Sequence, residues 1–239
     1  MISRRQALVT GLSSLGAALM LPGCTKPLPP TYGNILRMAD NLTYMAHRAL
    51  LPGQSLAREY SYSDVSSFPA TGTTDPSKLS EDYARLSGTS FDDFRLSVEG
   101  QVSKPGLYSL ADLMNLGRTT QITKHTCEEG WTAIAEWTGV QLGTLLQHAG
   151  ILPSARFILF HTYDEWLDSI DMMDAFHPQT LIAYGMNGKT LPIQHGAPIR
   201  LRLERQIGYK SIKYIKKIEV SDKFVDYGED IGWAWYTGI

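Results

Sequence analysis

The chain has 239 residues, of which 43% are hydrophobic and 19% are charged, and its formal net charge at pH 7 is −2. This composition suits an ordinary globular core, and the sequence contains no repeat and no low-complexity tract. The charge gives no reason to expect nucleic acid or an acidic membrane as a partner, and the length allows one large domain or a domain with an appendage.

Residues 1–24 have the pattern of an export signal. A short basic head with the pair Arg4-Arg5 precedes an uncharged apolar run over residues 8–21, which is too short for a transmembrane helix. The paired arginines predict the twin-arginine route, which exports folded proteins, and therefore a periplasmic location. The sequence Leu-Pro-Gly-Cys at residues 21–24 resembles a lipoprotein cleavage box with Cys24 as the lipid-bearing residue. Simple cleavage nearby is the alternative.

Removal of residues 1–23 takes away two arginines and no acid, so the formal charge changes from −2 to −2 minus 2, or −4. Cys24 and Cys127 then remain as the only thiols. Two cysteines in an exported protein would ordinarily suggest a disulfide. If Cys24 carries lipid, Cys127 is a single thiol in an oxidising compartment, where it needs burial or a metal to protect it.

Residues 25–90 read as a tether, a helix and a loop that pack on a main domain at residues 91–239. Three prolines within residues 26–30 form the tether. Residues 32–51 carry apolar side chains at helical spacing, namely Ile35, Leu36, Ala39, Leu42, Met45, Ala46, Ala49 and Leu50, and predict an amphipathic helix that packs on the main domain. Residues 54–88 have weak periodicity, and their hydroxyl-rich part at 66–76 either wraps a polar ligand or is plain surface loop.

The main domain reads as a mixed, mainly-β fold of the α+β class. Alternating or buried strands are expected at 94–99, 119–126, 157–160, 199–203 and 212–220. Short helices are expected at 109–116 with Ser109 as the N-cap, from about 142 to 149 with Gly150 as the stop, and at 172–176. The pair Asn187-Gly188 predicts a hairpin turn within residues 181–191.

Charge is divided along this domain. Residues 189–217 hold eight Lys or Arg residues and one acid, Glu204, whereas residues 128–174 hold eight acids and one base, Arg156. A basic segment of this kind suits an anion such as a phosphate, and a solvated strand face explains it equally well.

The stretch from His125 to Trp131 contains the one cysteine expected to do chemistry. Cys127 stands at a strand end among histidine, two glutamates and glycine, and we interpret it as a thiolate ligand to a metal centre. A small buried thiol is the plain alternative. A zinc site would need paired ligand spacing that His125, Cys127, His161 and His177 do not provide. A cysteine hydrolase, with His125 as base, shows no family signature.

Three segments together resemble the molybdopterin domain of the sulfite oxidase superfamily. They are Cys127-Glu-Glu-Gly-Trp131, the run from Tyr184 to Arg200 with Leu-Pro-Ile-Gln-His-Gly-Ala-Pro-Ile-Arg, and Gly208-Tyr-Lys-Ser-Ile-Lys213. The similarity extends from about Phe94 to Val220, and the nearest branch resembles the periplasmic protein-methionine-sulfoxide reductase catalytic subunit.

The resemblance implies a single molybdenum–molybdopterin cofactor with Cys127 as the protein ligand to molybdenum. It also implies cofactor contacts by Phe68, Thr162, His195, Arg200, Ser211, Ile212 and Lys213. We further expect Glu129 and Trp131 to orient the Cys127 loop, with His177 close enough to reach the site. Two departures stand out: position 195 is Asn in the reductase branch, and of that branch's Asn-Asn-Phe-Tyr run only Phe68 has a counterpart here.

The expected activity is oxygen-atom transfer, in the first place reduction of an S-oxide or N-oxide in a small molecule or a protein. Electrons would come from a partner, either a membrane haem protein or a periplasmic cytochrome. The alternatives are sulfite oxidation that passes electrons to a cytochrome and a cofactor-less binding lipoprotein on the same fold. We expect a monomer, because the chain leaves no room after its last strand for the dimerisation domain of sulfite oxidases, and membrane attachment only through Cys24.

Overall fold

The computed structural model describes residues 32–51, 53, 55–225 and 235–238. The export signal, Cys24 and the tether prolines therefore lie outside the described residues. The chain divides into two compact units, Met1–Leu36 and Arg37–Ile239, and the expected boundary near residue 90 stays a prediction. No helix within the described ranges is long and apolar enough to cross a bilayer.

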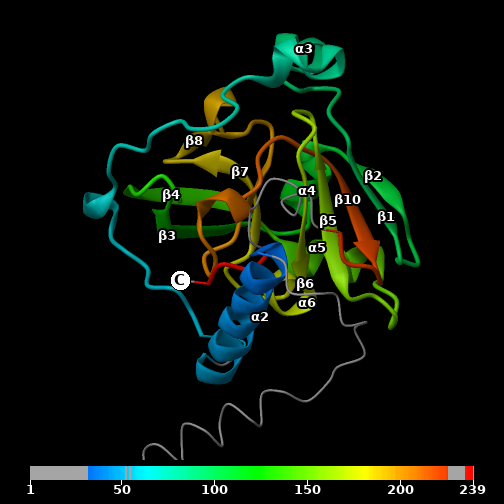
Figure 1. Ribbon diagram of the computed structural model, residues 1–239. Coiled ribbons are helices and arrows are strands. Elements are labelled where there is room, and N and C mark those ends of the chain that lie inside the picture. The colour runs from blue at the N-terminus through cyan, green and yellow to red at the C-terminus, as the bar shows by residue number, and fades with distance from the viewer. Residues whose placement is uncertain (1–31, 52, 54, 226–234, 239) are drawn as a thin grey trace, which may run out of the picture. The chain divides into compact units, whose positions relative to one another are not determined.

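The first sheet has the strand order β2-β1-β10-β5-β6 (Figure 1). Its strands are β1 (Leu96–Gly100), β2 (Gly106–Tyr108), β5 (Phe157–Thr162), β6 (Leu167–Asp171) and β10 (Ile215–Ser221). β1 and β10 run parallel and the other neighbours are antiparallel. The short turn between β5 and β6 carries Asp164 and Trp166 to the edge of the site described below.

The second sheet is antiparallel and holds the Cys127 stretch. Its order is β3-β4-β7-β8, and β9 pairs with β7. The strands are β3 (Thr119–Thr126), β4 (Thr132–Gln141), β7 (Leu181–Met186), β8 (Lys189–Thr190) and β9 (Arg200–Arg202). Cys127 follows β3 directly, as the alternation of residues 119–126 predicts.

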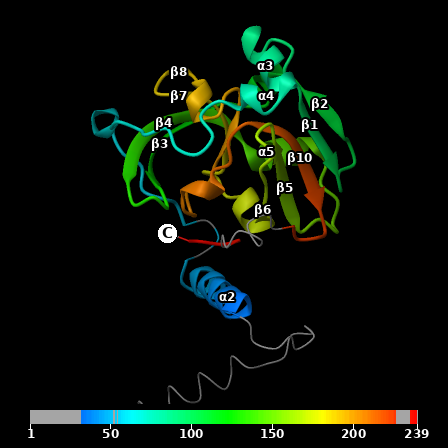
Figure 2. The same ribbon diagram turned by 45° about the horizontal axis from the view of Figure 1, so that its top comes forward.

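The main core fills the space between the two sheets. Helix α5 (Leu142–Ala149) lies between them (Figures 1 and 2) and buries Leu142, Leu145 and Leu146. Apolar side chains of β1, β5 and β10 meet those of β4, β7 and β9 in one cluster. A smaller cluster on β4 and β7 surrounds Trp137 and takes in Phe68 from the loop that precedes the domain.

Several local predictions are confirmed. Ser109 caps α4 (Leu110–Asn115) with a reciprocal capping box to Asp112, and Gly150 ends α5 in the left-handed conformation. Asn187 and Gly188, with φ of 51° and 71°, form the hairpin turn between β7 and β8, as a type I′ turn requires. The predicted turn at 172–176 is α6 (Met172–Ala175). The α+β class is likewise confirmed.

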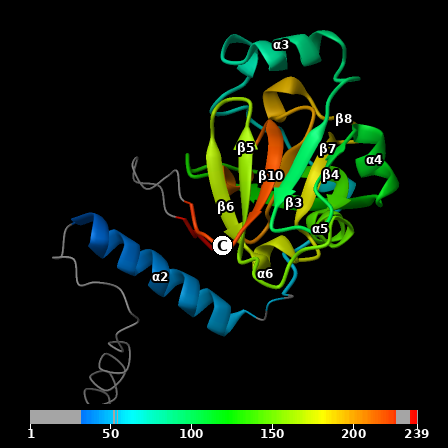
Figure 3. The ribbon, with the colours of Figure 1, turned by 90° about the vertical axis from the view of Figure 1, so that its right-hand side faces the viewer.

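The sequence patterns did not predict strands β2, β4 and β6 or one of the helices, and a second helix faces the opposite way. Helix α3 (Glu81–Gly88) forms inside the segment expected to be loop (Figure 3). Its Tyr83 is fully buried and donates a hydrogen bond to the Ala197 carbonyl oxygen at 2.7 Å. Helix α2 (Tyr32–Leu50) forms where predicted. Its apolar positions Leu42 and Met45 are nevertheless exposed, whereas Asp40 is buried. The periodicity predicted the helix correctly and its buried face wrongly.

Candidate active site

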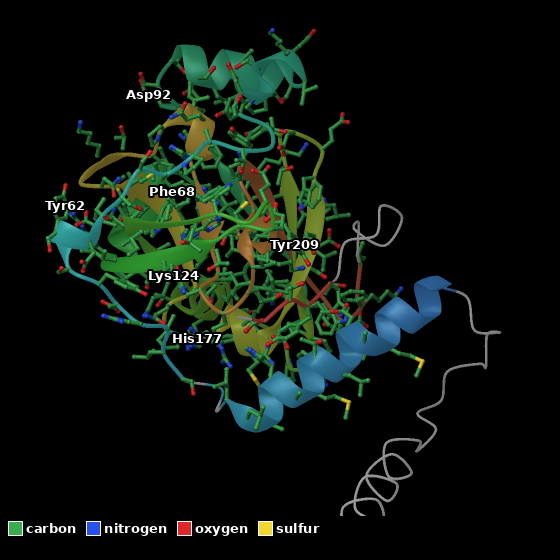
Figure 4. All side chains as sticks on the ribbon, turned by 60° about the vertical axis from the view of Figure 1, so that its left-hand side comes forward. Tyr62, Phe68, Asp92, Lys124, His177 and Tyr209 are labelled. Carbon is green, nitrogen blue, oxygen red and sulfur yellow. The ribbon has the colours of Figure 1, made fainter. Side chains whose placement is uncertain are left out.

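A cavity of about 280 Å³ opens beside Cys127. Four segments line it: the 66–76 loop, the end of β3 with its turn, the β5–β6 turn, and the stretch from Gln194 to Lys213. Phe68 on the 66–76 loop and Tyr209 on η4 (Gly208–Lys210) both border it (Figure 4). The topology therefore brings together side chains that are far apart in sequence.

The turn after β3 holds Cys127 in a fixed position. The Cys127 amide donates to the Trp131 carbonyl oxygen at 2.9 Å, and the Gly130 amide donates to the Cys127 carbonyl oxygen at 3.1 Å. Gly130 has φ of 89°, a conformation that glycine adopts without strain. Cys127 is 4% exposed, and Sγ lies 3.4 Å from Glu128 Oε2. Burial and the Glu128 charge raise the pKa of the thiol, so a bound cation is what would make it a thiolate.

His125, two residues earlier, belongs to a buried polar network. Arg202 donates from Nη1 to His125 Nδ1 at 2.7 Å and forms two hydrogen bonds with Glu204, at 3.1 and 2.8 Å. Gln121 also donates to Glu204, at 3.0 Å. Because a guanidinium can only donate, Nδ1 is the acceptor and Nε2 carries the proton of the neutral ring. Arg202 is thus neutralised by Glu204 and fixes the orientation of a side chain that lines the cavity.

Arg200 is buried without such neutralisation. It donates from Nη1 to the His195 carbonyl oxygen at 3.0 Å and from Nη2 to the Ser211 carbonyl oxygen at 2.7 Å. Its Nε is buried and has no hydrogen-bond partner in the described ranges. Among the described residues no carboxylate forms an ion pair with it. Burial and the charge of Arg202 lower the pKa of Arg200 to about 9. A bound anion would stabilise the charged guanidinium.

Lys213 ties the 66–76 loop to this cationic region. Its Nζ donates to the carbonyl oxygens of Thr71, at 2.7 Å, and Thr73, and Tyr214 donates to the Thr73 carbonyl oxygen at 3.0 Å. Burial and the charge of Arg200 lower the pKa of Lys213 to about 8. The loop is thus held over the cavity by backbone carbonyls on a lysine.

Phe68 anchors the same loop from its other end. Its ring lies 5.0 Å from that of His125, 5.5 Å from Trp131 and 5.4 Å from His195, measured between ring centroids. Tilted and edge-to-face arrangements at such distances are favourable. Phe68 therefore links the Cys127 turn to the His195 segment.

Within the described ranges, no three His, Cys, Asp or Glu side chains converge to hold a metal ion. Cys127 is therefore the single soft protein donor that the cavity presents, and further ligands to a metal there would come from a cofactor.

The model of the oxidoreductase molybdopterin binding domain matches residues 84–226, which is more than half of the chain. The chain belongs to this family. Helix α2 lies outside the matched region, and the whole cavity except its 66–76 loop lies inside it.

Relatives of known name support the same assignment. The chain is 40% identical over 146 residues to YedZ1 of Azospira oryzae, provisionally named a protein-methionine-sulfoxide reductase subunit; the match covers 61% of this chain and 56% of that one. It is 30% identical over 230 residues to the protein-methionine-sulfoxide reductase catalytic subunit MsrP of Xanthomonas campestris, covering 89% and 68%. The sulfane dehydrogenase SoxCD of Paracoccus pantotrophus has a similar structure, with a TM-score of 0.55, 26% identity, and coverage of 58% and 40%.

These findings confirm the resemblance to the sulfite oxidase superfamily and to its reductase branch. The chain spans a little over half the length of YedZ1 and less than half of the SoxCD chain. It is an oxidoreductase domain of this family, and the activities of the longer relatives are their own.

The structure brings most of the predicted site residues together. Those that line the family's cavity here are Phe68, Cys127, Trp131, His195, Arg200, Ser211, Ile212 and Lys213. Their roles toward a cofactor stay predictions.

Three predicted residues lie outside the lining. Thr162 is buried behind it and donates to Asp164 at 2.6 Å, which positions the β5–β6 turn. Glu129 accepts from Trp131 Nε1 at 3.1 Å. His177 lies away from Phe68 (Figure 4). Its Nε2 is 3.0 Å from the carbonyl oxygen of Ser55, which comes soon after helix α2. It is a buried histidine with its own partners and does not line the cavity.

Sequence reasoning missed the residues that support the lining. Trp137 lies under both arginines, with its ring centroid 5.1 Å from Arg200 Cζ and 4.4 Å from Arg202 Cζ. The alternation of arginines at positions 200 and 202 was the sequence signal that could have indicated this buried support. The interpretation of that alternation as a solvated face is wrong, because Arg200 and Arg202 are 4% and 1% exposed.

His195 gives the site a pH dependence that can be measured. Burial and the charges of Arg200 and Lys213 lower its pKa from 6.5 to about 4. Between these values the unfolded chain binds a proton that the folded chain does not, so the free energy of unfolding falls as the pH falls. The expected contribution is about 1.4 kcal/mol per pH unit.

Urea unfolding of the cofactor-free protein between pH 6.5 and 4.5 checks this prediction. The His195→Asn variant should lose less stability over that range than the parent, whereas the exposed control His148→Asn should not differ from it. Equal slopes for the parent and His195→Asn would contradict the assigned environment.

Proposed function

We propose that this chain is an exported molybdenum–molybdopterin oxidoreductase that reduces an S-oxide, taking electrons one at a time from a partner protein. Family membership and the names of the reductase relatives support the cofactor and the substrate class. The paired arginines at residues 4 and 5 support export of a folded, cofactor-loaded protein to the periplasm, with Cys24 as a candidate lipid anchor.

The residues of the cavity fit such a cofactor. Arg200 has a buried, unpartnered Nε and no carboxylate partner among the described residues, and Lys213 shares its lowered pKa. Both suit a phosphate, which offers several acceptor oxygens and negative charge. Cys127, with its raised pKa, suits a metal that displaces the thiol proton.

The roles follow from these positions. Cys127 would hold the metal, while Arg200, Lys213 and the 211–212 backbone would hold the phosphate end, and His195 and Phe68 would border the pterin. When bound, the group supplies two-electron oxygen-atom transfer. The chain positions the group, excludes water by means of the 66–76 loop, and admits the substrate.

The observation that carries the substrate assignment is the charge beside Cys127. Glu128 Oε2 lies 3.4 Å from Sγ, and Trp131, Trp166 and Asp164 line the same cavity. An anionic substrate such as sulfite would approach a carboxylate there, at a cost that low polarity increases. A neutral S-oxide does not meet this repulsion, and aromatic rings suit its apolar substituents.

The electron partner belongs to the same proposal. A membrane haem protein is the preferred donor. The relatives are named as subunits of a reductase, which supports a separate electron-donating partner. A periplasmic cytochrome is the alternative, and it fits sulfite oxidation equally well. Apart from this electron partner we propose no further subunit, and we expect the chain itself to be a monomer.

Cys127→Ser should abolish turnover and leave the fold intact, because serine keeps the volume but is a poor ligand for a soft site. Molybdenum content and circular dichroism are measured on the parent and the variant. Full activity in the variant would reject the ligand role. A parent protein that contains no molybdenum after expression in a host that makes the cofactor would reject the enzyme and favour a cofactor-less binding lipoprotein.

Arg200→Met should weaken retention of the pterin phosphate. Loss of a charge-assisted contact of about 1.5–3 kcal/mol corresponds to roughly 10- to 100-fold weaker binding. Pterin content after gel filtration measures the loss, with the exposed Arg156→Met as a matched control. Pterin content equal to that of the control would show that Arg200 does not hold the cofactor.

The reduced, molybdenum-loaded protein should be reoxidised by methionine sulfoxide, free or in a peptide, faster than the oxidised protein is reduced by sulfite. Glu128→Gln tests the physical reason, since removing the carboxylate charge should raise the rate with sulfite and change the rate with a neutral sulfoxide little. Rapid sulfite oxidation by the parent would favour the dehydrogenase-type alternative, and N-oxides serve as a second neutral class.

A further inference from the structure

Helix α2 is attached to the rest of its compact unit through its polar side. Asp40 accepts hydrogen bonds from the Trp235 and Tyr236 amides at 3.1 and 3.3 Å. Arg48 forms ion pairs with Asp171 at 3.0 Å and Asp174 at 2.9 Å. The two hydrogen bonds of Asp40 and the two ion pairs of Arg48 lie on one side of the helix. The charged side chains in the described part of α2 therefore face the rest of the unit.

Aromatic contacts strengthen this attachment. Tyr44 donates to Asp171 at 2.9 Å, and its ring centroid lies 5.0 Å from that of Trp235. Tyr236 hydrogen-bonds His47 Nδ1 at 2.9 Å, and the Arg48 guanidinium lies over the rings of Tyr44 and Tyr236. The helix is thus held in one rotational setting about its own axis.

This setting turns the apolar side outward. Met38, Leu42, Met45 and Leu50 are 61%, 47%, 54% and 79% exposed. The remaining exposed residues between positions 38 and 50 are Ala39, Asn41, Thr43, Ala46 and Ala49, none of them charged. A surface helix ordinarily buries its apolar face, so an uncharged apolar stripe held outward by buried ion pairs indicates a covered surface.

The chain before the helix identifies what covers it. Cys24, the candidate lipid-bearing residue, precedes the first residue of α2 by residues 25–31 alone. This length of chain spans at most about 30 Å. An acyl group on Cys24 therefore keeps the start of α2 within that distance of a bilayer.

We propose that the outward face of α2, formed by Met38, Leu42, Met45 and Leu50, lies on the lipid bilayer beside the Cys24 anchor and fixes the orientation of the domain on the membrane. Interfacial helices bury their apolar face about 5–10 Å into the headgroup and acyl boundary. The face lacks charge, so its contact with lipid is insensitive to salt. The proposal goes beyond the proposed function, and α2 lies outside the region that the family model matches.

A site-specific label distinguishes the possible coverings. The full, cofactor-loaded chain is prepared with Leu42→Cys or, as a matched control, Leu107→Cys, which replaces a leucine that is 68% exposed on β2. Each is labelled with a fluorophore, and the unsubstituted chain gives the background from Cys24 and Cys127. The proteins are added to vesicles of phosphatidylethanolamine and phosphatidylglycerol. Quenching is measured with a nitroxide lipid and, separately, with aqueous iodide.

We expect the label at position 42 to be quenched several-fold more by the nitroxide lipid than the label at position 107, at low and high salt alike. Adding Met38→Gln and Met45→Gln should abolish the difference, whereas Leu79→Gln with Met114→Gln should preserve it. Persistent iodide access at position 42, or failure of the chain to associate with the vesicles, overturns the proposal. Shielding from both quenchers also overturns it and assigns the face to a protein partner. None of these outcomes depends on turnover at the molybdenum site.

Discussion

An arginine that is buried without a counter-ion in the described part of the chain determines the charge of the site. Arg200 and Arg202 alternate along β9 and both lie against Trp137. Among the residues that the structure describes, Arg202 has a carboxylate partner, Glu204, and Arg200 has none. A buried cation without an anion is costly, and backbone carbonyls from His195 and Ser211 offset that cost only in part. The same cost, that of burying positive charge close to other cations, lowers the pKa values of Arg200, Lys213 and His195. A bound phosphate would relieve all three at once.

Arg202, whose charge is neutralised by Glu204, holds neighbouring side chains in position. The Glu204 carboxylate aligns Arg202, which in turn orients the His125 ring at the end of β3, two residues before Cys127. Breaking a fully hydrogen-bonded buried pair is expensive. Strand β9, which carries Arg200, therefore also restrains the end of β3 beside the Cys127 thiol. One short strand, β9, therefore sets both ends of the cavity.

Local signals in the sequence predicted the parts of the fold that local physics controls. The Ser109 cap, the Gly150 stop and the Asn187-Gly188 turn each depend on the conformational preference of one or two residues. Burial could not be predicted in this way. The alternation around Arg200 is compatible with a wet or a dry arginine face, and only the packing of Trp137 decides between them.

The same limit explains Thr162, His177 and α2. Thr162 acts through the turn that it braces, and His177 is held by a loop carbonyl oxygen more than a hundred residues earlier in the chain. Residues 32–51 showed their apolar stripe plainly, but the stripe alone does not say whether protein or another phase covers it. The resemblance to a family supplied the lining residues, because its motifs record which distant segments meet.

The uneven charge along the chain becomes a direction within the cavity. Acids from the segment at residues 128–174 reach it through the β3–β4 and β5–β6 turns, as Glu128 and Asp164, whereas cations from the segment at residues 189–217 reach it as Arg200 and Lys213. A ligand with an anionic end and a metal end can satisfy both sides in one orientation only, with its anion on the basic residues and its metal at Cys127. The acids beside the thiol would then lie near the metal end of such a ligand, where they would favour a substrate without negative charge. Binding of the cofactor and selection of the substrate would both depend on this one separation of charge.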